Sequence, residues 1–265
     1  MSSLQIAARI TRVNLRAALE YRADFVIGVI LGIVWQGAVL VFATVLINRF
    51  AGLDGWPKGQ VLLIAALRMT AHALYVLLFG SLTWTPTLVV EGRIEGYLLR
   101  PMSVHRQVVL SSMNINAVGD MSVAAVLIAL ALGYADVAWT PLHILYVLAT
   151  LAGAILVEAG LATVIAGFAL RSVPTTPWSR WLDEICTTFG NYPLGILPGL
   201  VEGALTFVLP IAFLAYLPAA VITGHHTGLG VPYWLAVLSP LAGVVVYGLG
   251  KLVWRYNLNR YSGVN

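Results

Sequence analysis

Charge and cysteine are scarce in this sequence, and the short motifs of common catalytic sites are missing. Charged residues make up 10% of the 265 positions, and Cys186 is the single cysteine, which excludes an internal disulfide bond. No G-x-x-x-x-G-K-[S/T] phosphate loop occurs, so the chain lacks the usual cradle for ATP. It also lacks the His-Glu-x-x-His and paired-cysteine motifs of zinc sites. Energy for any active process must therefore come from another chain or from an ion gradient.

Long apolar runs, by contrast, fill most of the chain. Hydrophobic residues account for 60% of it, and the mean hydropathy is +0.89. Apolar runs of about 20 residues match the thickness of a bilayer. No small-residue cleavage pattern follows the first run, so we expect no removed signal peptide. These features predict an all-α integral membrane fold with one domain, residues 1–265, and six spans at roughly 25–47, 61–85, 108–133, 142–170, 204–222 and 233–254.

The basic residues are distributed unevenly around these spans. Of the 15 lysines and arginines, all but Arg49, Lys58 and the intramembrane Arg68 fall on the side that carries both termini. Because cytoplasmic loops of membrane proteins are enriched in basic residues, we expect both termini in the cytoplasm. The net charge of +4 then reflects topology and contact with anionic lipid, and we expect no nucleic acid partner.

A charged amphipathic helix is predicted over residues 4–22, before the first span. Arg9, Arg12 and Arg16 share one face at helical spacing, beside an apolar face. Such a helix lies in the headgroup layer with its arginines near lipid phosphates. It is either an anchor or an elbow that transmits the movement of a cytoplasmic partner into the first span.

A conspicuously charged loop lies between the second and third spans, over residues 89–101. Pro101 ends its predicted helix. Tyr97, Leu98 and Leu99 form an apolar patch that we expect to be exposed. A solvated connector needs no such patch, whereas the pocket of a partner protein would bury it. The candidate contact residues are Glu91, Arg93, Glu95, Tyr97, Leu98, Leu99 and Arg100.

Four polar side chains lie inside predicted spans: Arg68, His72, Asp120 and Glu158. An unpaired charge at the bilayer centre is costly, so each of them should face the interior of the helix bundle. The first interpretation is a structural pair, such as Arg68 with Glu158, that locks helix packing. The alternatives are a polar lining for a substrate path and a role in proton coupling.

Glycine and proline positions predict local features in two places. Gly28 and Gly32 form a small-x-x-x-small pair, which lets another helix approach the first span closely. Residues 174–202 contain glycines and prolines that interrupt an apolar run. Irregular backbone at membrane depth needs protein or a cavity to cover it, so we expect an interfacial or re-entrant segment there.

Three sets of motifs follow one another along the chain. The first is Glu91-Gly-Arg-Ile-Glu-Gly-Tyr-Leu-Leu-Arg-Pro-Met-Ser. The second is Asn191-Tyr-Pro-Leu-Gly-Ile-Leu-Pro-Gly, with Phe207-Val-Leu-Pro-Ile-Ala-Phe and Tyr216-Leu-Pro-Ala after it, and the third is Arg260-Tyr-Ser-Gly. In this order and spacing they resemble a bacterial subfamily of type-2 ABC exporter permeases, with its Tyr-Leu-Leu-Arg-Pro signature and Arg-Tyr-Ser-Ser-x-Gly tail. The second serine of that tail is missing here, yet the resemblance covers essentially the whole chain.

The resemblance implies a permease subunit of an ATP-binding cassette exporter in the bacterial cytoplasmic membrane. Two permease subunits, identical or sister chains, would dimerise on partner ATPase subunits that bind ATP and Mg. The first cytoplasmic loop of such exporters carries the coupling helix, which corresponds to residues 91–100 here. In this family the first and fifth spans help form the dimer contact, so Gly28 and Gly32 of the first span become candidates for that face. The resemblance also implies a hydrophobic or amphipathic substrate, and no catalytic site, metal or cofactor on this chain.

Two other classes of function stay open from the residues alone. A gradient-driven secondary carrier is expected to have inverted repeats and a central ion site, and neither is evident in the sequence. An integral-membrane lipid-modifying enzyme needs clustered acidic or histidine side chains near an interface, for which Asp183 and Glu184 offer thin support. A neighbouring gene for an ATPase with a phosphate loop would favour the exporter over both.

Overall fold

The computed structural model describes residues 9–10, 12–14, 16, 20, 22–49, 55–112, 114, 116–171, 175–226 and 228–263; within 22–49, side chains are described at 22–38, 41 and 45. Over these ranges the regular elements are helices, and no strand occurs among them. The predicted helix over residues 4–22 lies mostly outside the described residues, as does residue 174.

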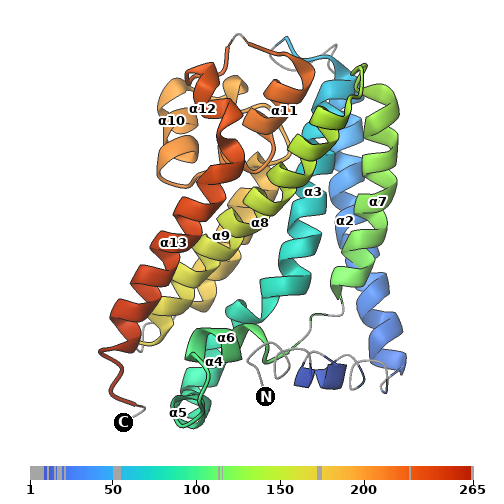
Figure 1. Ribbon diagram of the computed structural model, residues 1–265. Coiled ribbons are helices and arrows are strands. Elements are labelled where there is room, and N and C mark those ends of the chain that lie inside the picture. Colours follow the sequence, from blue (N-terminus) through green and yellow to red (C-terminus); the bar gives the residue numbers. More distant parts are fainter. Residues whose placement is uncertain are drawn as a thin grey trace.

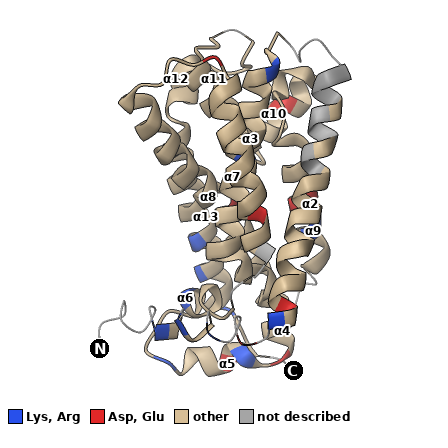
Figure 2. Ribbon diagram, turned by 90° about the vertical axis from the view of Figure 1, so that its right-hand side faces the viewer, with Lys and Arg blue, Asp and Glu red and all other residues tan. Residues whose placement is uncertain are grey.

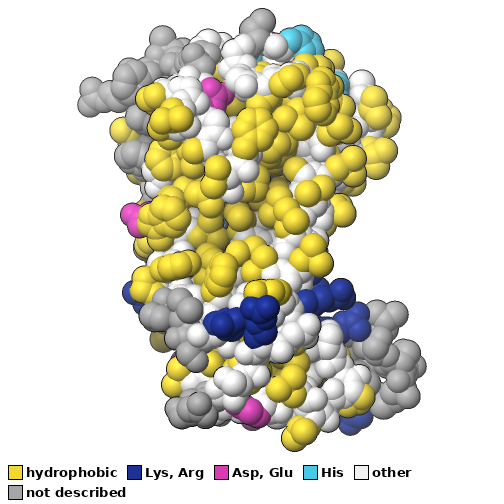
Figure 3. Space-filling view, turned by 90° about the vertical axis from the view of Figure 1, so that its left-hand side faces the viewer, with side chains coloured by type: hydrophobic (Ala, Val, Ile, Leu, Met, Phe, Trp, Pro, Cys, Tyr) yellow, Lys and Arg dark blue, Asp and Glu magenta, His cyan; other side chains and the backbone are white. Residues whose placement is uncertain are grey.

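Five long helices run side by side and form a bundle (Figure 1). They are α2 (Arg22–Arg49), α3 (Lys58–Phe79), α7 (Asn116–Tyr134), α8 (Pro141–Ala169) and α13 (Ser239–Leu258). Their outward faces carry large exposed hydrophobic side chains, such as Leu145 on α8 and Val245 on α13. A helix that is apolar all round is stable where its outer face meets hydrocarbon instead of water. Figure 3 shows hydrophobic side chains over the bundle, above a belt of Lys and Arg.

Three of the described helical segments are long and apolar enough to cross a membrane: Lys58–Val90, Ala117–Tyr134 and Pro141–Ala169. A fourth candidate is the pair Gly199–Phe207 and Ile211–Thr223, which is bent by 72°. Helices α2 and α13, with 28 and 20 residues, lie alongside them in the bundle. The predicted all-α membrane fold is therefore confirmed, whereas the number of spans stays a prediction.

Helices α8 and α13 pack against each other backbone to backbone. The contact is made by glycines: Gly153 and Gly160 on α8, and Gly243 and Gly250 on α13. A Cβ atom on Gly160 would stand 2.7 Å from the amide nitrogen of Tyr247, and one on Gly250 would stand 2.5 Å from the carbonyl oxygen of Gly160. Small residues permit this approach because they add no atoms between the two backbones.

Short helices close one end of the bundle. They are α10 (Gly199–Phe207), α11 (Tyr216–Thr223) and α12 (Tyr233–Val237) (Figure 1). The 3-10 turn η2 (Leu194–Ile196) precedes α10, and η3 (Ile211–Phe213) lies between α10 and α11. The predicted fifth span, 204–222, is not one helix, because Pro210 has no amide hydrogen and the helix axis bends there. The predicted sixth span, 233–254, is likewise divided into α12 and α13 at Leu238.

Helix α9 (Thr176–Phe189) enters the bundle from the end of α8. The ring of its Trp178 lies 6.3 Å from that of Phe168, near the last residue of α8. At its other end, a Cβ atom on Gly190 would stand 3.0 Å from Nε of Arg68, in the middle of α3. The described part of this segment, residues 175–202, therefore leads into the bundle, and its assignment as an interfacial or re-entrant segment stays a prediction.

A small lobe of three short helices lies at the opposite end from α10, α11 and α12. It consists of α4 (Thr85–Val90), α5 (Arg93–Leu98) and α6 (Val104–Val109), which follow α3 through the 3-10 turn η1 (Gly80–Trp84). The start of α2 and the end of α13 lie at the same end of the molecule (Figure 1). Most Lys and Arg residues gather there (Figure 2), so the lobe and both ends of the described chain share the basic side.

The predicted third span is corrected at its lobe end. The predicted second span, 61–85, lies within the apolar segment Lys58–Val90, in which α3 ends at Phe79 and the chain continues through η1 into α4. The third span is predicted to begin at 108, but α7 begins only at Asn116. The hydroxyl of Ser111 donates a hydrogen bond to the carbonyl oxygen of Val108 at 2.7 Å. Such local side-chain bonds compete with helix continuation, which accounts for the break.

Candidate functional site

The two faces of α5 meet opposite environments. Gly92 precedes α5 at φ +66°, a left-handed conformation that glycine adopts without strain, and it lets the chain turn from α4 into α5. Tyr97 is buried, with 7% of its surface exposed, whereas Leu98 and Leu99 are 50% and 88% exposed. The expected exposure of Tyr97 is therefore wrong, because Tyr97 shares a face with the buried Ile94 at a spacing of three. The expectation holds for Leu98 and Leu99.

The buried face of the lobe packs on the ends of two long helices. Its core joins Leu88, Ile94, Tyr97, Val104 and Val108 to Ala162 and Ala166 of α8, to Leu170 directly after α8, and to Trp254 of α13. Burying a large apolar side chain contributes roughly 2 kcal/mol, so this shared core holds the lobe firmly. The lobe is thus in direct side-chain contact with α8 and α13.

Two polar contacts also fix α5 in place. Tyr261, just after α13, donates its hydroxyl hydrogen to Oε1 of Glu95 at 2.6 Å. Gln107 of α6 donates from Nε2 to the carbonyl oxygens of Tyr97 and Met102, at 2.8 and 2.7 Å. Burial, together with the neighbouring Glu95 carboxylate, raises the pKa of Tyr261 to about 12, so its hydroxyl remains a donor at neutral pH.

His105 of α6 is buried against both α8 and α13. Its Nε2 lies 3.2 Å from Oγ1 of Thr163, and its ring stands edge-on to that of Trp254 at 5.1 Å. Burial, with a smaller contribution from the Lys251 charge, lowers the pKa of His105 to about 3. The ring is therefore neutral at physiological pH, which suits its apolar surroundings.

The outer face of the lobe combines apolar and charged side chains. Exposed Leu98 and Leu99 lie close in sequence to Glu91, Arg93 and Arg100, which are also exposed. Nη1 of Arg93 lies 3.5 Å from Oε2 of Glu91, an exposed pair that contributes little to stability. These side chains are therefore available for contact with another molecule.

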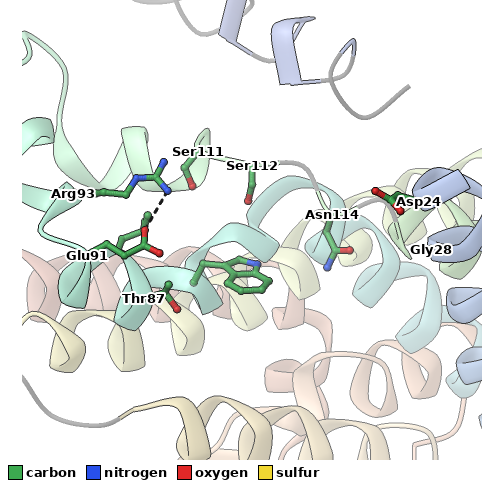
Figure 4. Close-up of a pocket in the computed structure, with 10 residues that line it drawn as sticks. Asp24, Gly28, Thr87, Glu91, Arg93, Ser111, Ser112 and Asn114 are labelled. Carbon is green, nitrogen blue, oxygen red and sulfur yellow. Dashed lines mark hydrogen bonds and ion pairs between the residues drawn. The ribbon is translucent and has the colours of Figure 1, made fainter. Parts of the chain in front are cut away.

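A cavity of about 550 Å³ separates the lobe from α2 (Figure 4). Its lining includes Glu91, Arg93, Ser111, Ser112, Asn114, Asp24 and Gly28. In Figure 4 the pair Glu91–Arg93 lies at one end, and Asp24 and Gly28 lie at the other. Nearby, Nδ2 of Asn14 donates to the carbonyl oxygen of Leu110 at 2.8 Å, so part of the predicted 4–22 segment contacts the chain that follows α6.

The glycine pair of the first span faces another helix of the same chain. Gly28 and Gly32 are buried, and a Cβ atom on Gly119 of α7 would stand 3.1 Å from Cα of Gly32. The predicted close packing is therefore present within the subunit, between α2 and α7. A role of these glycines in a dimer contact stays a prediction.

Three of the four polar residues predicted inside the spans form one buried cluster. Oε1 of Glu158 lies 3.5 Å from Nη1 of Arg68, and Oε2 of Glu158 lies 2.7 Å from Nδ1 of His72. Arg68 and Glu158 are 2% and 5% exposed. The expected pairing of Arg68 with Glu158 is present, and it joins α3 to α8. Asp120 of α7 is buried and forms no ion pair with this cluster, but it lines a cavity that His72 also lines.

Sequence reasoning misses the contacts that hold the lobe. The Arg260-Tyr261-Ser262 motif marks Tyr261, but its partner Glu95 lies 166 positions away and no spacing rule links them. His105 carries no signal in a single sequence, since a lone histidine in a basic loop is more often exposed. Both residues become informative only when α13 is seen beside the lobe.

Comparison with curated proteins finds no match, and comparison with solved structures finds none either. A family model described as ABC-2 family transporter protein matches residues 33–264. The match includes most of α2, the whole lobe and the Tyr261 tail, and it confirms the resemblance at the level of the family. Its apolar helices agree with a membrane protein that serves transport. The chain belongs to the ABC-2 family of transporter proteins.

Proposed function

We propose that this chain is the transmembrane permease subunit of an ATP-binding cassette exporter, with α5 as its coupling helix. The observation that carries the proposal is the two-sided lobe, which exposes Leu98 and Leu99 while Ile94 and Tyr97 pack inward. An exposed apolar pair with charged neighbours has the composition of a protein docking surface, with an apolar centre and a polar rim. The groove of an ATPase subunit is the occupant that the family resemblance favours.

The energy would come from that partner, because this sequence has no phosphate loop. ATP and Mg would bind to the ATPase subunits, and closure of the ATPase dimer would move α5. The packed core between the lobe, α8 and α13 supports transmission of this movement into the bundle. The hydrogen bond from Tyr261 to Glu95 adds a second link between α5 and the end of α13.

We further propose that the chain crosses the bacterial inner membrane six times, with both termini in the cytoplasm. Five of the crossings would be the long helices α2, α3, α7, α8 and α13. The sixth would be formed by α9 together with α10. Basic residues and both ends of the described chain lie beside the lobe, which supports an even number of crossings and a cytoplasmic lobe. Two permease subunits, identical or sister chains, would then form the path for a hydrophobic or amphipathic substrate.

The test is copurification from the native host, with Leu99→Asp as the variant. The tagged chain is purified in nanodiscs, and its partners are quantified by mass spectrometry. We expect a stoichiometric ATPase with a phosphate loop beside the unaltered chain. Leu99→Asp should reduce its amount at least tenfold, because the charge would have to be buried in an apolar contact.

The matched control is Asn259→Asp, which adds the same charge at an exposed position after α13. It should leave the amount of ATPase unchanged. A well-folded chain that brings down no ATPase would contradict the exporter and favour a carrier or a membrane enzyme. If the ATPase stays bound to the Leu99→Asp variant and transport is normal, the proposed role of α5 is contradicted, whereas the proposed exporter function is not.

A further inference from the structure

A cavity of about 680 Å³ lies among α2, α3, α7 and α9, beside the buried cluster of Arg68, His72 and Glu158. Its volume falls within the range of pockets that hold small molecules. The lining that matters here comes from all four helices: Trp35, His72, Asp120, Arg180, Asp183 and Glu184. Neither the family match nor the coupling lobe assigns a role to this cavity.

The charged groups of the cavity are mainly acidic. Three carboxylates, from Asp120, Asp183 and Glu184, face one guanidinium, from Arg180, which leaves two negative charges when His72 is neutral. Arg180 lies one helical turn from Asp183 and Glu184 on α9, so those side chains offset its charge locally. One of the two negative charges then remains on α9, and the other is that of Asp120 on α7.

Asp120 is the group that points to a ligand. It is 93% buried, being 7% exposed, and within the described residues it makes no hydrogen bond or ion pair. A buried carboxylate without a partner is costly, and such residues within membrane helices commonly serve function. Its position in the cavity wall leaves the carboxylate accessible to a bound molecule.

The basic side chains of α3 that lie nearest this carboxylate are held by another acidic group. Arg68 pairs with Glu158 at 3.5 Å, and Nδ1 of His72 is hydrogen-bonded to the other oxygen of Glu158 at 2.7 Å. Arg68 and His72 of α3 are therefore both engaged with Glu158 of α8. The charge of His72 acts on Asp120 when the imidazole is protonated, but among the described residues no basic group forms an ion pair with this carboxylate, which leaves it open to a cationic ligand.

The opposite part of the cavity is apolar. Leu31, Trp35 and Val76 belong to its lining, and the Trp35 ring is largely exposed. The face of an indole ring attracts cations as well as apolar groups. A molecule that joins a positive charge to an apolar body would thus match both parts of the cavity.

We propose that this cavity binds an amphipathic organic cation, with Asp120 as its counter-ion and Trp35 against its apolar part. The binding of this ligand does not depend on the proposed permease function. Its identification as a transported substrate does rest on that function. The binding test therefore uses the purified chain alone in nanodiscs, without ATPase or ATP. A failure to bind counts against the cavity proposal only, whereas the copurification experiment tests the permease function.

The probe is the cation tetraphenylphosphonium. Tetraphenylborate, an anion of nearly the same shape, is the control for the sign of the charge. We expect saturable binding of radiolabelled tetraphenylphosphonium above the level of empty nanodiscs, with no competition from tetraphenylborate. Asp120→Asn should raise the Kd at least tenfold, equivalent to about 1.4 kcal/mol. Asp136→Asn removes the same charge from an exposed loop position after α7 and should leave the Kd unchanged.

Three results would overturn the proposal. They are the absence of saturable binding, equal competition by tetraphenylborate, and an Asp120→Asn protein that binds like the unaltered chain. If Asp120→Asn does not fold, Trp35→Ala decides, because this exposed side chain contributes little to the packing of the subunit. An unchanged Kd in Trp35→Ala would then overturn the proposal, and a Kd raised severalfold would support it.

Discussion

Replacing Glu158 by glutamine should destabilise the subunit strongly although the side chain keeps its shape. At 3.5 Å and an effective dielectric constant of about 20, the attraction between Arg68 and Glu158 amounts to about 5 kcal/mol. In the variant, the Arg68 charge stays buried without a counter-ion, and its Nε and Nη2 already lack hydrogen-bond partners in the described structure. Removing one member of a buried pair typically costs about 3–5 kcal/mol, so we expect a loss of this size.

Thermal unfolding in nanodiscs, followed by tryptophan fluorescence, measures the effect. For a chain of this length about 1 kcal/mol corresponds to about 2–4 °C, so a loss of 3 kcal/mol lowers the unfolding midpoint by about 6–12 °C. The double variant Arg68→Gln with Glu158→Gln removes both charges and should recover most of the loss. Glu91→Gln, at an exposed position, serves as control and should change stability by less than about 0.5 kcal/mol.

Two outcomes would refute the structural role of the pair. The first is an unchanged midpoint in Glu158→Gln, and the second is a double variant as unstable as the single one. A Glu158→Gln protein of normal stability but altered cargo preference would instead place Glu158 in the substrate path.

Two further predictions concern the α8–α13 contact and the lobe. Gly160→Ala should cost about 1–3 kcal/mol of stability, because its Cβ would stand 2.7 Å from the Tyr247 amide nitrogen. Gly248→Ala on α13 is the control, because a Cβ atom at Gly248 would have no atom within 4 Å. Equal midpoints of thermal unfolding for the two variants would contradict the close contact at Gly160. Because the pKa of buried His105 is lowered to about 3, the unfolded chain binds a proton that the folded chain excludes, and stability should fall as pH drops from about 6.5 toward 3. Between pH 7 and pH 5, the unfolding midpoint of the His105→Gln variant should fall less than that of the unaltered chain. Identical dependence of the two midpoints on pH would count against a neutral buried His105.

The sequence was sufficient for the fold class and for the basic side of the molecule, because both follow from local composition. Hydropathy identifies apolar helices, and the distribution of Lys and Arg identifies one end. The pairing of Arg68 with Glu158 could also be anticipated, since opposite charges in neighbouring spans lower each other's cost. These inferences need no knowledge of how the chain folds back on itself.

The path of the chain beyond α8 could not be derived in this way. Residues 174–202 and 204–222 are both apolar and both broken, and hydropathy does not say which of them enters the bundle. The expectation that Tyr97 on α5 is exposed was wrong for the same reason, since local sequence does not show which helices lie beside α5. In a six-residue helix, periodicity groups Ile94 with Tyr97, but only the position of α8 and α13 decides that this group is buried.

The glycine contact between α8 and α13 has a consequence for how the subunit can change shape. Since backbone lies directly on backbone, no side chain is present to change rotamer and permit sliding. The two helices, with the lobe fastened to both, should therefore behave as a single rigid body. Any rearrangement that starts at α5 must then open or close the boundary with α2, α3, α7 and α9. The Arg68–Glu158 pair joins α3 to α8 across that boundary, so its separation of 3.5 Å is the quantity that movement of α5 should alter.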